Sequence, residues 1–378
     1  MHNFERYLPY KKQDIIKVVH GIGVNRKIKF RYDILNEYNQ KIAELKDTIS
    51  AEITCDNAAA IKKSMKISYR DTGNSFFINK LMPVVSFLME DGEFLDFPQG
   101  VYIMGDISKK EAGNSLIIDL TMFDEIKRLD NEKTDYRHYI AAGTLYYNAI
   151  EAILNRFDIV DVNGIDGANH KGIFDIEYTS EALGVDREWE IGKSYLEILK
   201  DLLKDINYTD IWTDEIGVFR ARKKKLLEEM AEEYIYQDNE TSIQANGVIN
   251  NSDYFDIPNK WIVTASNPDS IPITATLENQ SDISFRGQTV TRFGTIDYIA
   301  NKEALEEYVN LLAESDKVTE KIEFETGIAP FHDVLDVYKV KNKTHNLDKK
   351  YQESAWNMKL EIGAKMHHTA IRKVNLYD

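Results

Sequence analysis

The sequence predicts an α+β protein dominated by β-structure, in which a small α/β segment separates two β-rich segments. Three observations support this fold class: period-two alternation near both ends, helical spacing in the middle, and a composition with 21 Tyr and only 7 Pro. Aromatic residues favour strands, and a chain of 378 residues is long enough for several domains. The predicted domains are residues 1–130, 131–230 and 231–378.

The first segment is predicted to be an antiparallel β domain. Apolar residues occupy every second position from Ile28 to Ile34 and again from Leu116 to Met122. This alternation is typical of strands with one buried face. Between them, Phe87–Leu95 contains two apolar runs joined at Asp91-Gly92, which predicts a hairpin because glycine tolerates positive φ.

The middle segment changes to helical spacing. Apolar residues from Tyr146 to Phe157 recur every three or four positions, which predicts a helix. A Ser-x-x-Glu capping box at Ser194 and Glu197 starts a second helix that extends to Ile206. A hairpin with its turn at Gly217 is expected to follow, completing an α/β insert.

The last segment returns to strands. Residues Lys260–Ala265 form a short β run, and apolar residues alternate with polar ones from Trp356 to Ile362. One helix is expected between them, with Asn301 as its N-cap and an apolar face from Leu305 to Leu312.

Charge and composition exclude several classes of protein. The 47 Lys and Arg against 63 Asp and Glu give a net charge of −16, whereas binding of a nucleic-acid backbone needs a basic surplus. No apolar run is long enough to span a bilayer, and Met1–Tyr7 lacks the apolar region of a signal peptide. Cys55 is the single cysteine, which excludes an intrachain disulfide and favours folding in a reducing cytoplasm.

Two motifs resemble ligand-binding loops without fitting them. His20–Arg26 contains Gly-x-Gly, but Arg26 stands where a third glycine is needed, so a turn before the next strand is predicted. Asp161–Gly167 resembles a calcium loop, but Ile165 occupies a ligand position and Gly172 the position of the final glutamate. A solvent-exposed turn is expected there.

The remaining candidates also favour structural roles. His367 and His368 are neighbours in a predicted strand, so they face opposite sides and cannot chelate together within one chain. Cys55 is expected to be a buried, inert thiol. The basic stretch Arg220–Lys225 is expected to form charge pairs within or between subunits. The sequence therefore predicts no catalytic residue, no cofactor-binding residue and no metal ligand.

Three strings carry a resemblance to a known family. They are Ser194–Arg222, a capped helix followed by strand–turn–Gly–strand; Tyr254–Val263, similar to the strand that opens a second tube domain; and Trp356–Val374, similar to a closing strand pair. In these strings and in element order the chain resembles the baseplate hub, or tail-associated protein, family of tailed phages, prophages and phage-tail-like particles.

The resemblance implies two related β-barrel-like tube domains, residues 1–130 and 231–378, that superpose and flank the insert at 131–230. Such hubs are homotrimers, so the tube domains would form a ring of six modules. The ring would join a tail tube or distal tail protein to a spike or central fibre protein and line the channel for DNA passage. The implied location is the virion tail, assembled in the host cytoplasm without a signal peptide or membrane binding.

The resemblance implies no catalytic residue and no cofactor, with DNA only as a passing cargo. A trimer would carry three times −16, or −48 formal charges, and an acidic channel would repel DNA rather than retain it. Two other functions stay open. One is a cell-wall or carbohydrate-binding module of the tail tip, using tyrosine- and tryptophan-rich strands, and the other is a cell-wall hydrolase.

Overall fold

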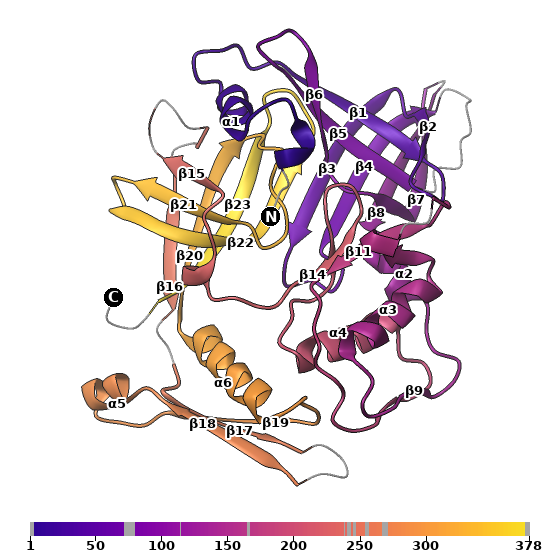
Figure 1. Ribbon diagram of the computed structural model, residues 1–378. Coiled ribbons are helices and arrows are strands. Elements are labelled where there is room, and N and C mark those ends of the chain that lie inside the picture. Colours follow the sequence, from indigo (N-terminus) through magenta and orange to yellow (C-terminus); the bar gives the residue numbers. More distant parts are fainter. Residues whose placement is uncertain are drawn as a thin grey trace.

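The structure is a computed structural model that describes residues 4–71, 80–113, 115–164, 167–237, 239, 243–244, 247–253, 257–266 and 271–374. It confirms a β-dominated α+β fold (Figure 1). The α-helices are α1 (Lys12–His20), α2 (Ile126–Asn131), α3 (Tyr146–Arg156), α4 (Tyr195–Asp205), α5 (Gln280–Arg286) and α6 (Lys302–Asp316). Short 3-10 helices are η1 (Phe4–Tyr7), η2 (Val162–Gly164) and η3 (Leu227–Glu229). No helix among the described residues is both long enough and apolar enough to cross a bilayer.

One large sheet dominates the molecule, with the order β16-β20-β23-β22-β3-β4-β8-β7-β5-β1-β2 along its main path. Three more strands join the sheet off this path: β21 pairs with β22, β15 pairs with β21, and β6 pairs with β5. From the first half of the chain come β1 (Ile28–Leu35), β2 (Lys41–Glu44), β3 (Thr48–Asp56), β4 (Lys63–Asp71), β5 (Lys80–Leu88), β6 (Phe94–Pro98), β7 (Tyr102–Ala112) and β8 (Ser115–Asp124). From the second half come β15 (Tyr234–Gln237), β16 (Ile249–Asp253), β20 (Val318–Gly327), β21 (Val337–Asn342), β22 (Leu347–Lys359) and β23 (Lys365–Val374).

The N-terminal β-structure agrees with the sequence pattern. Strands β1 to β8 pair with one another in antiparallel fashion, and alternate residues of β8 are buried from Ile118 to Asp124. The predicted hairpin forms, with Leu88 opposite Phe94 and Gly92 at a φ of 90°. Helix α1 was not predicted. It buries Ile15, and Gly21 ends it in the left-handed conformation.

The two halves of the chain share the sheet through one seam. Strand β22 pairs antiparallel with β3, and the register places Trp356 opposite Cys55 and Met358 opposite Ile53. On its other edge β22 pairs with β23, as the sequence predicted for the closing strand pair. The seam therefore makes β22 a central strand that joins the C-terminal β-structure to the N-terminal β-structure.

The insert packs two helices beside a small sheet. That sheet has the order β10-β11-β14-β13, and β9 and β12 form a separate pair. Both predicted helices are confirmed, and Glu197 N donates to Ser194 Oγ at 3.2 Å while Ser194 N donates to Glu197 at 2.9 Å. The predicted hairpin forms as well. The strands are β9 (His138–Ile140), β10 (Ile159–Asp161), β11 (Gly172–Ile176), β12 (Arg187–Trp189), β13 (Trp212–Thr213) and β14 (Phe219–Ala221).

A separate layer lies within the last segment. Strands β17 (Lys260–Ala265), β18 (Ile273–Glu278) and β19 (Thr291–Ile296) form a three-stranded sheet against α6 (Figure 1). The strand predicted at Lys260–Ala265 is thus confirmed as β17, which belongs to this small sheet and not to the large one. Residues 254–256 of the string Tyr254–Val263 lie outside the described residues.

Two further expectations for the last segment need correction. The strand ends at Lys359 and the alternation of buried residues at Leu360, whereas Ile362 is exposed in the turn before β23, where Gly363 has a φ of 82°. The described residues of the segment also contain two α-helices, α5 and α6, rather than one. The predicted helix, α6, does begin as expected, because Ala304 N donates to Asn301 Oδ1 at 2.8 Å.

The buried apolar residues form two hydrophobic clusters, which correspond to the large sheet with the insert and to the small sheet with α6. The main cluster runs from Tyr7 to Ala370 and includes buried residues of the large sheet and of the insert. The second cluster contains ten buried residues between Trp261 and Ala313 and belongs to the small sheet and α6. The large sheet and the insert therefore share one core, and the small layer has its own.

Candidate functional site

A buried loop marks the place where the segments of the chain meet. Residues 328–336, which we call the junction loop, connect β20 to β21, and all of them except Leu335 are buried. Loops usually lie on the surface, because a buried loop must find partners for its backbone polar groups. Leu335 also has a φ of 65°, a conformation that costs free energy in a residue with a branched side chain.

Side chains from distant segments provide those partners. Gln99 donates to Pro330 O at 2.9 Å, and Arg26 donates to Ile328 O. Near the end of the loop, Gln352 donates to Leu335 O at 3.2 Å. The N-terminal β-structure and β22 therefore both hold the junction loop in place.

A buried ion pair adds the insert to this contact. Lys63 of β4 forms an ion pair with Asp333 of the junction loop, and its ammonium group donates to Thr213 O of β13 at 3.0 Å. Burial alone would lower the pKa of Lys63, but attraction to Asp333 raises it above its ordinary value. Burial would likewise raise the pKa of Asp333, but the Lys63 charge lowers it. Both groups are therefore charged at neutral pH.

A second contact fixes the insert against the N-terminal segment. Arg6 pairs with Asp214 at 3.2 Å and also with Glu215, and Gly100 N donates to Glu215 O at 2.9 Å. Gly217 in this turn has a φ of 85°, and a Cβ there would lie 2.9 Å from the Val101 side chain. Only glycine fits this close approach.

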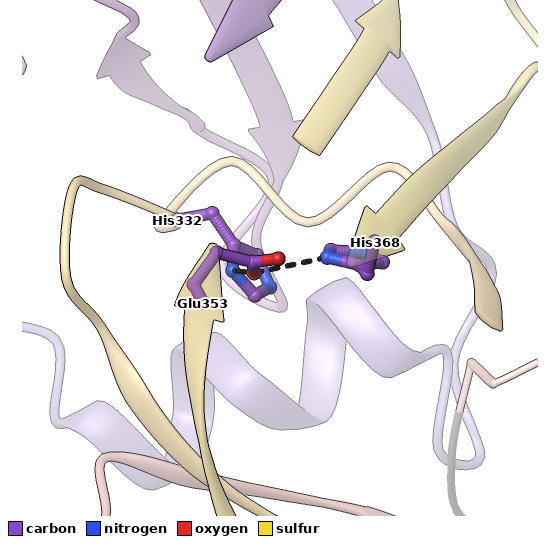
Figure 2. A group of neighbouring side chains, drawn as sticks. All are labelled: His332, Glu353 and His368. Carbon is purple, nitrogen blue, oxygen red and sulfur yellow. Dashed lines mark hydrogen bonds and ion pairs between the residues drawn. The ribbon is translucent and has the colours of Figure 1, made fainter. Parts of the chain in front are cut away.

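A buried polar group lies behind the junction loop. His332 of the loop, Glu353 of β22 and His368 of β23 converge on one point (Figure 2), and we call them the His–Glu–His cluster. His332 Nδ1 is 2.8 Å and His368 Nδ1 is 3.1 Å from the same atom, Glu353 Oε2. The potential ligand atoms of the three residues all lie within 4.8 Å of one another.

Hydroxyl groups surround the cluster. Tyr236 hydrogen-bonds to Nε2 of His332, and Tyr234 Oη lies 3.0 Å from Nδ1 of the same ring. Thr326 Oγ1 lies 2.8 Å from Nε2 of His368. Both ring nitrogens of each histidine therefore have a polar neighbour, as buried imidazoles require.

Burial determines the charge of the cluster. It lowers the pKa of His332 to about 4, with a further contribution from His368, and that of His368 to about 3. Burial also raises the pKa of Glu353 to about 7. Both imidazoles are consequently neutral at pH 7, and Glu353 is the group in the cluster that can carry charge.

The structure separates the neighbouring histidines as the sequence predicted. The His367 side chain is 60% exposed and pairs with Glu325 at 3.1 Å, whereas His368 is fully buried. The sequence analysis did not single out His332 or Glu353. A β-bulge between Glu353 and Ala355 places Glu353 on the buried face, which simple alternation from Trp356 would not predict.

The other candidate motifs have structural roles. Cys55 is buried, and burial raises the pKa of its thiol, in agreement with an inert cysteine. Within the basic stretch, Arg220 pairs with Asp214 at 2.9 Å and Lys223 with Glu307 at 3.1 Å, so the predicted charge pairing is confirmed. The turn expected at residues 161–167 begins with Asn163 N donating to Asp161 at 2.6 Å, but residues 165–166 lie outside the described residues.

Comparison with solved structures shows what the whole fold is similar to. A tail protein from Neisseria meningitidis MC58 aligns with a TM-score of 0.63 and 11% identity, covering 92% of this chain and 96% of that one. The 43 kDa tail protein of prophage MuSo2 from Shewanella oneidensis also aligns with a TM-score of 0.63, at 10% identity, covering 92% of this chain and 98% of that one. This is the fold of phage tail proteins.

A third tail-protein structure has the same fold. The prophage tail protein gp18 from Listeria monocytogenes EGD-e aligns with a TM-score of 0.53 and 14% identity, covering 90% of this chain and 94% of that one. No protein-family model matches the sequence, and no curated protein matches it. The tail-protein fold is thus recognised through the arrangement of its elements, at a sequence identity too low to compare side chains one by one.

Proposed function

We propose that this chain is a structural tail protein that forms a homotrimeric baseplate hub. In this role it joins a sixfold tail tube or distal tail protein to a threefold spike or central fibre, and it lines the channel through which DNA passes. The observation that carries the proposal is the fold similarity, which extends over 92% of this chain and over 96% and 98% of two tail proteins. A shared fold of that extent favours a shared architectural role.

The connection between the two halves of the chain supports this role. The seam between β22 and β3 makes one sheet from strands on both sides of the insert. Lys63 of the N-terminal half contacts both Asp333 of the junction loop and Thr213 O of the insert, and Gln99 connects the N-terminal half to the junction loop again. A subunit that joins partners of different symmetry needs its modules held in a fixed relative orientation, and these contacts provide that rigidity.

The two ends of the large sheet support an oligomer. Within the described residues, β2 and β16 each pair along one edge only. Ile42 of β2 is 59% exposed and Ile249 of β16 is 52% exposed. Unpaired strand edges with apolar side chains favour association with another chain, and closure into a ring removes such edges.

The mass of the native particle tests the proposal. We expect light scattering to give a mass near three chains of 43.7 kDa, in solution or after addition of the neighbouring tail protein. Electron microscopy of that particle should show six similar β modules around a channel. A chain that stays monomeric with its tail partner present would contradict the hub.

A cell-wall assay separates the hub from the two other functions. Purified protein is incubated with bacterial cell walls, and both the pellet and the soluble fraction are examined. Release of soluble fragments would identify a hydrolase, and co-sedimentation without release would identify a wall-binding module. The hub predicts neither result.

A further inference from the structure

We propose that the His–Glu–His cluster is a structural Zn²⁺ site, with His332, Glu353 and His368 as protein ligands. This inference is independent of the proposed function, and it departs from the sequence-based expectation that the chain has no metal ligand. Its basis is the geometry of three buried side chains that come from three separate elements (Figure 2).

The spacing of the ligand atoms fits a single metal ion. Zinc binds histidine nitrogen and carboxylate oxygen at about 2.0–2.2 Å, so two ligands of a tetrahedral ion are separated by roughly 3.4 Å. The two Nδ1 atoms lie 2.8 Å and 3.1 Å from Glu353 Oε2. These two contacts are roughly 0.6 Å and 0.3 Å shorter than the separation in a tetrahedral zinc site, and all the ligand atoms lie within 4.8 Å of one another, so small side-chain movements are needed for one ion to bind all three groups.

The number of hydrogen-bond donors around His368 indicates a cation between His368 and Glu353. Thr326 has one hydroxyl proton, and Gly327 O, 2.8 Å away, can only accept it. Nε2 of His368 therefore donates to Thr326, and Nδ1 carries the ring's lone pair. When Glu353 is ionised, that lone pair faces a second acceptor, Glu353 Oε2, at 3.1 Å in a buried place. A metal ion between them removes the conflict.

The surroundings match those of a metal-bound histidine pair. Metal-ligating histidines usually hydrogen-bond through the ring nitrogen that does not touch the metal. Tyr236 occupies that position on His332, and Thr326 occupies it on His368. Glu353 also has a second buried carboxylate oxygen, Oε1, and the Tyr338 hydroxyl hydrogen-bonds to this carboxyl group.

Two neutral imidazoles and one carboxylate are a ligand set that zinc accepts. Hard cations such as Ca²⁺ and Mg²⁺ prefer all-oxygen shells, which this cluster does not offer. The ion would join the junction loop to β22 and β23. Because the ligands come together only in the folded chain, binding is expected to accompany folding.

The first experiment measures metal content and its effect on stability. The full chain is unfolded and refolded with ZnCl₂ or with EDTA, and zinc per chain is determined by mass spectrometry after removal of free metal. We expect one zinc per chain after refolding with ZnCl₂ and a higher melting temperature than in the EDTA sample. Replacing Zn²⁺ with Co²⁺ should give visible absorption bands typical of a four- or five-coordinate ion.

Two variants locate the ion. Glu353→Gln keeps the size of the side chain but removes its charge, and His367→Asn changes the neighbouring histidine that faces solvent. Removal of groups that only support metal ligands lowers affinity about 10- to 100-fold, so the loss of a ligand in Glu353→Gln should reduce zinc affinity by at least about 100-fold. His367→Asn should bind zinc like the unmodified chain.

Three outcomes would overturn the proposal. They are absence of zinc from the unmodified chain refolded with ZnCl₂, an unchanged melting temperature with bound zinc, and zinc lost in His367→Asn but kept in Glu353→Gln. The last outcome would place the ion on the surface, and the first would mean that a proton rather than a metal lies between Glu353 and His368. Because the unmodified chain alone decides the first two outcomes, the test does not depend on whether Glu353→Gln folds.

Discussion

At the scale of single residues, the Lys63 side chain connects three segments of the chain, namely the N-terminal β-structure, the insert and the junction loop. It is 3% exposed and Asp333 is 2% exposed, so Lys63→Met leaves a buried carboxylate without its cation and Thr213 O without its donor. Loss of one partner of a buried pair costs about 3–5 kcal/mol. We expect urea unfolding of Lys63→Met to show a decrease in unfolding free energy of that size. Lys110→Met, which breaks the exposed pair with Asp119, should cost about 1 kcal/mol or less, and equal losses would contradict the prediction.

Asp124 gives a pH-dependent prediction at the same scale. Burial raises its pKa to about 7, although it accepts hydrogen bonds from Lys63 N and Ile126 N. The folded chain therefore keeps a proton that the unfolded chain releases near pH 4. This group stabilises the fold at low pH, and its contribution is lost as the pH rises towards 7.

Asp124→Asn removes that titration. Between about pH 4 and 7, the unfolding free energy of the unmodified chain should fall more steeply with pH than that of the variant, by about 1.4 kcal/mol per pH unit at most. Urea unfolding at a series of pH values measures this difference. Asp119→Asn, whose carboxyl is exposed with a lowered pKa, serves as the control and should leave the slope above pH 5 unchanged. Equal slopes for all three proteins would contradict the prediction.

At the scale of elements, the seam between β22 and β3 is the feature on which the large sheet depends. Asn357 lies in the middle of the stretch of β22 that pairs with β3, opposite Thr54, with a 3.0 Å side-chain hydrogen bond between them. Proline at this position removes a backbone donor from a central strand. We expect Asn357→Pro to reduce unfolding free energy by about 3 kcal/mol or more, and Asn357→Thr to change it by less than about 1 kcal/mol. Equal midpoints of urea unfolding for the two variants would mean that the seam contributes little to the unfolding free energy of the protein.

Elements with a local signal could be predicted from sequence, and pairings between distant segments could not. The capping box at Ser194 and the hairpin at Gly92 are set by residues a few positions apart, and both are confirmed. The bulge beside Glu353 depends on pairing with β23, so alternation along one strand could not show which face Glu353 occupies. His332, Glu353 and His368 are likewise brought together by chain topology alone.

At the scale of the whole molecule, the two hydrophobic clusters predict two levels of stability. The smaller cluster has ten buried residues, four of which are alanines, so it buries little apolar surface. We expect β17–β19 and α6 to open at a lower free energy than β3 and β22, and native-state hydrogen exchange measures these opening free energies. Mass spectrometry of peptides from residues 257–316 and from the seam compares the two regions. Equal protection of both sets would show that the small layer unfolds together with the main core.

The net charge gives a last prediction about the whole particle. In the proposed hub, a channel built from chains of charge −16 would repel a phosphate backbone, since there is no basic surplus to release counterions from DNA. The basic stretch does not change this, because Arg220 and Lys223 are paired with acidic residues of the same chain. We therefore expect no retardation of double-stranded DNA in gel-shift assays at about 50 mM salt, where electrostatic binding is strong. A shift that disappears at about 200 mM salt would reveal a basic surface and would contradict passage of DNA without retention.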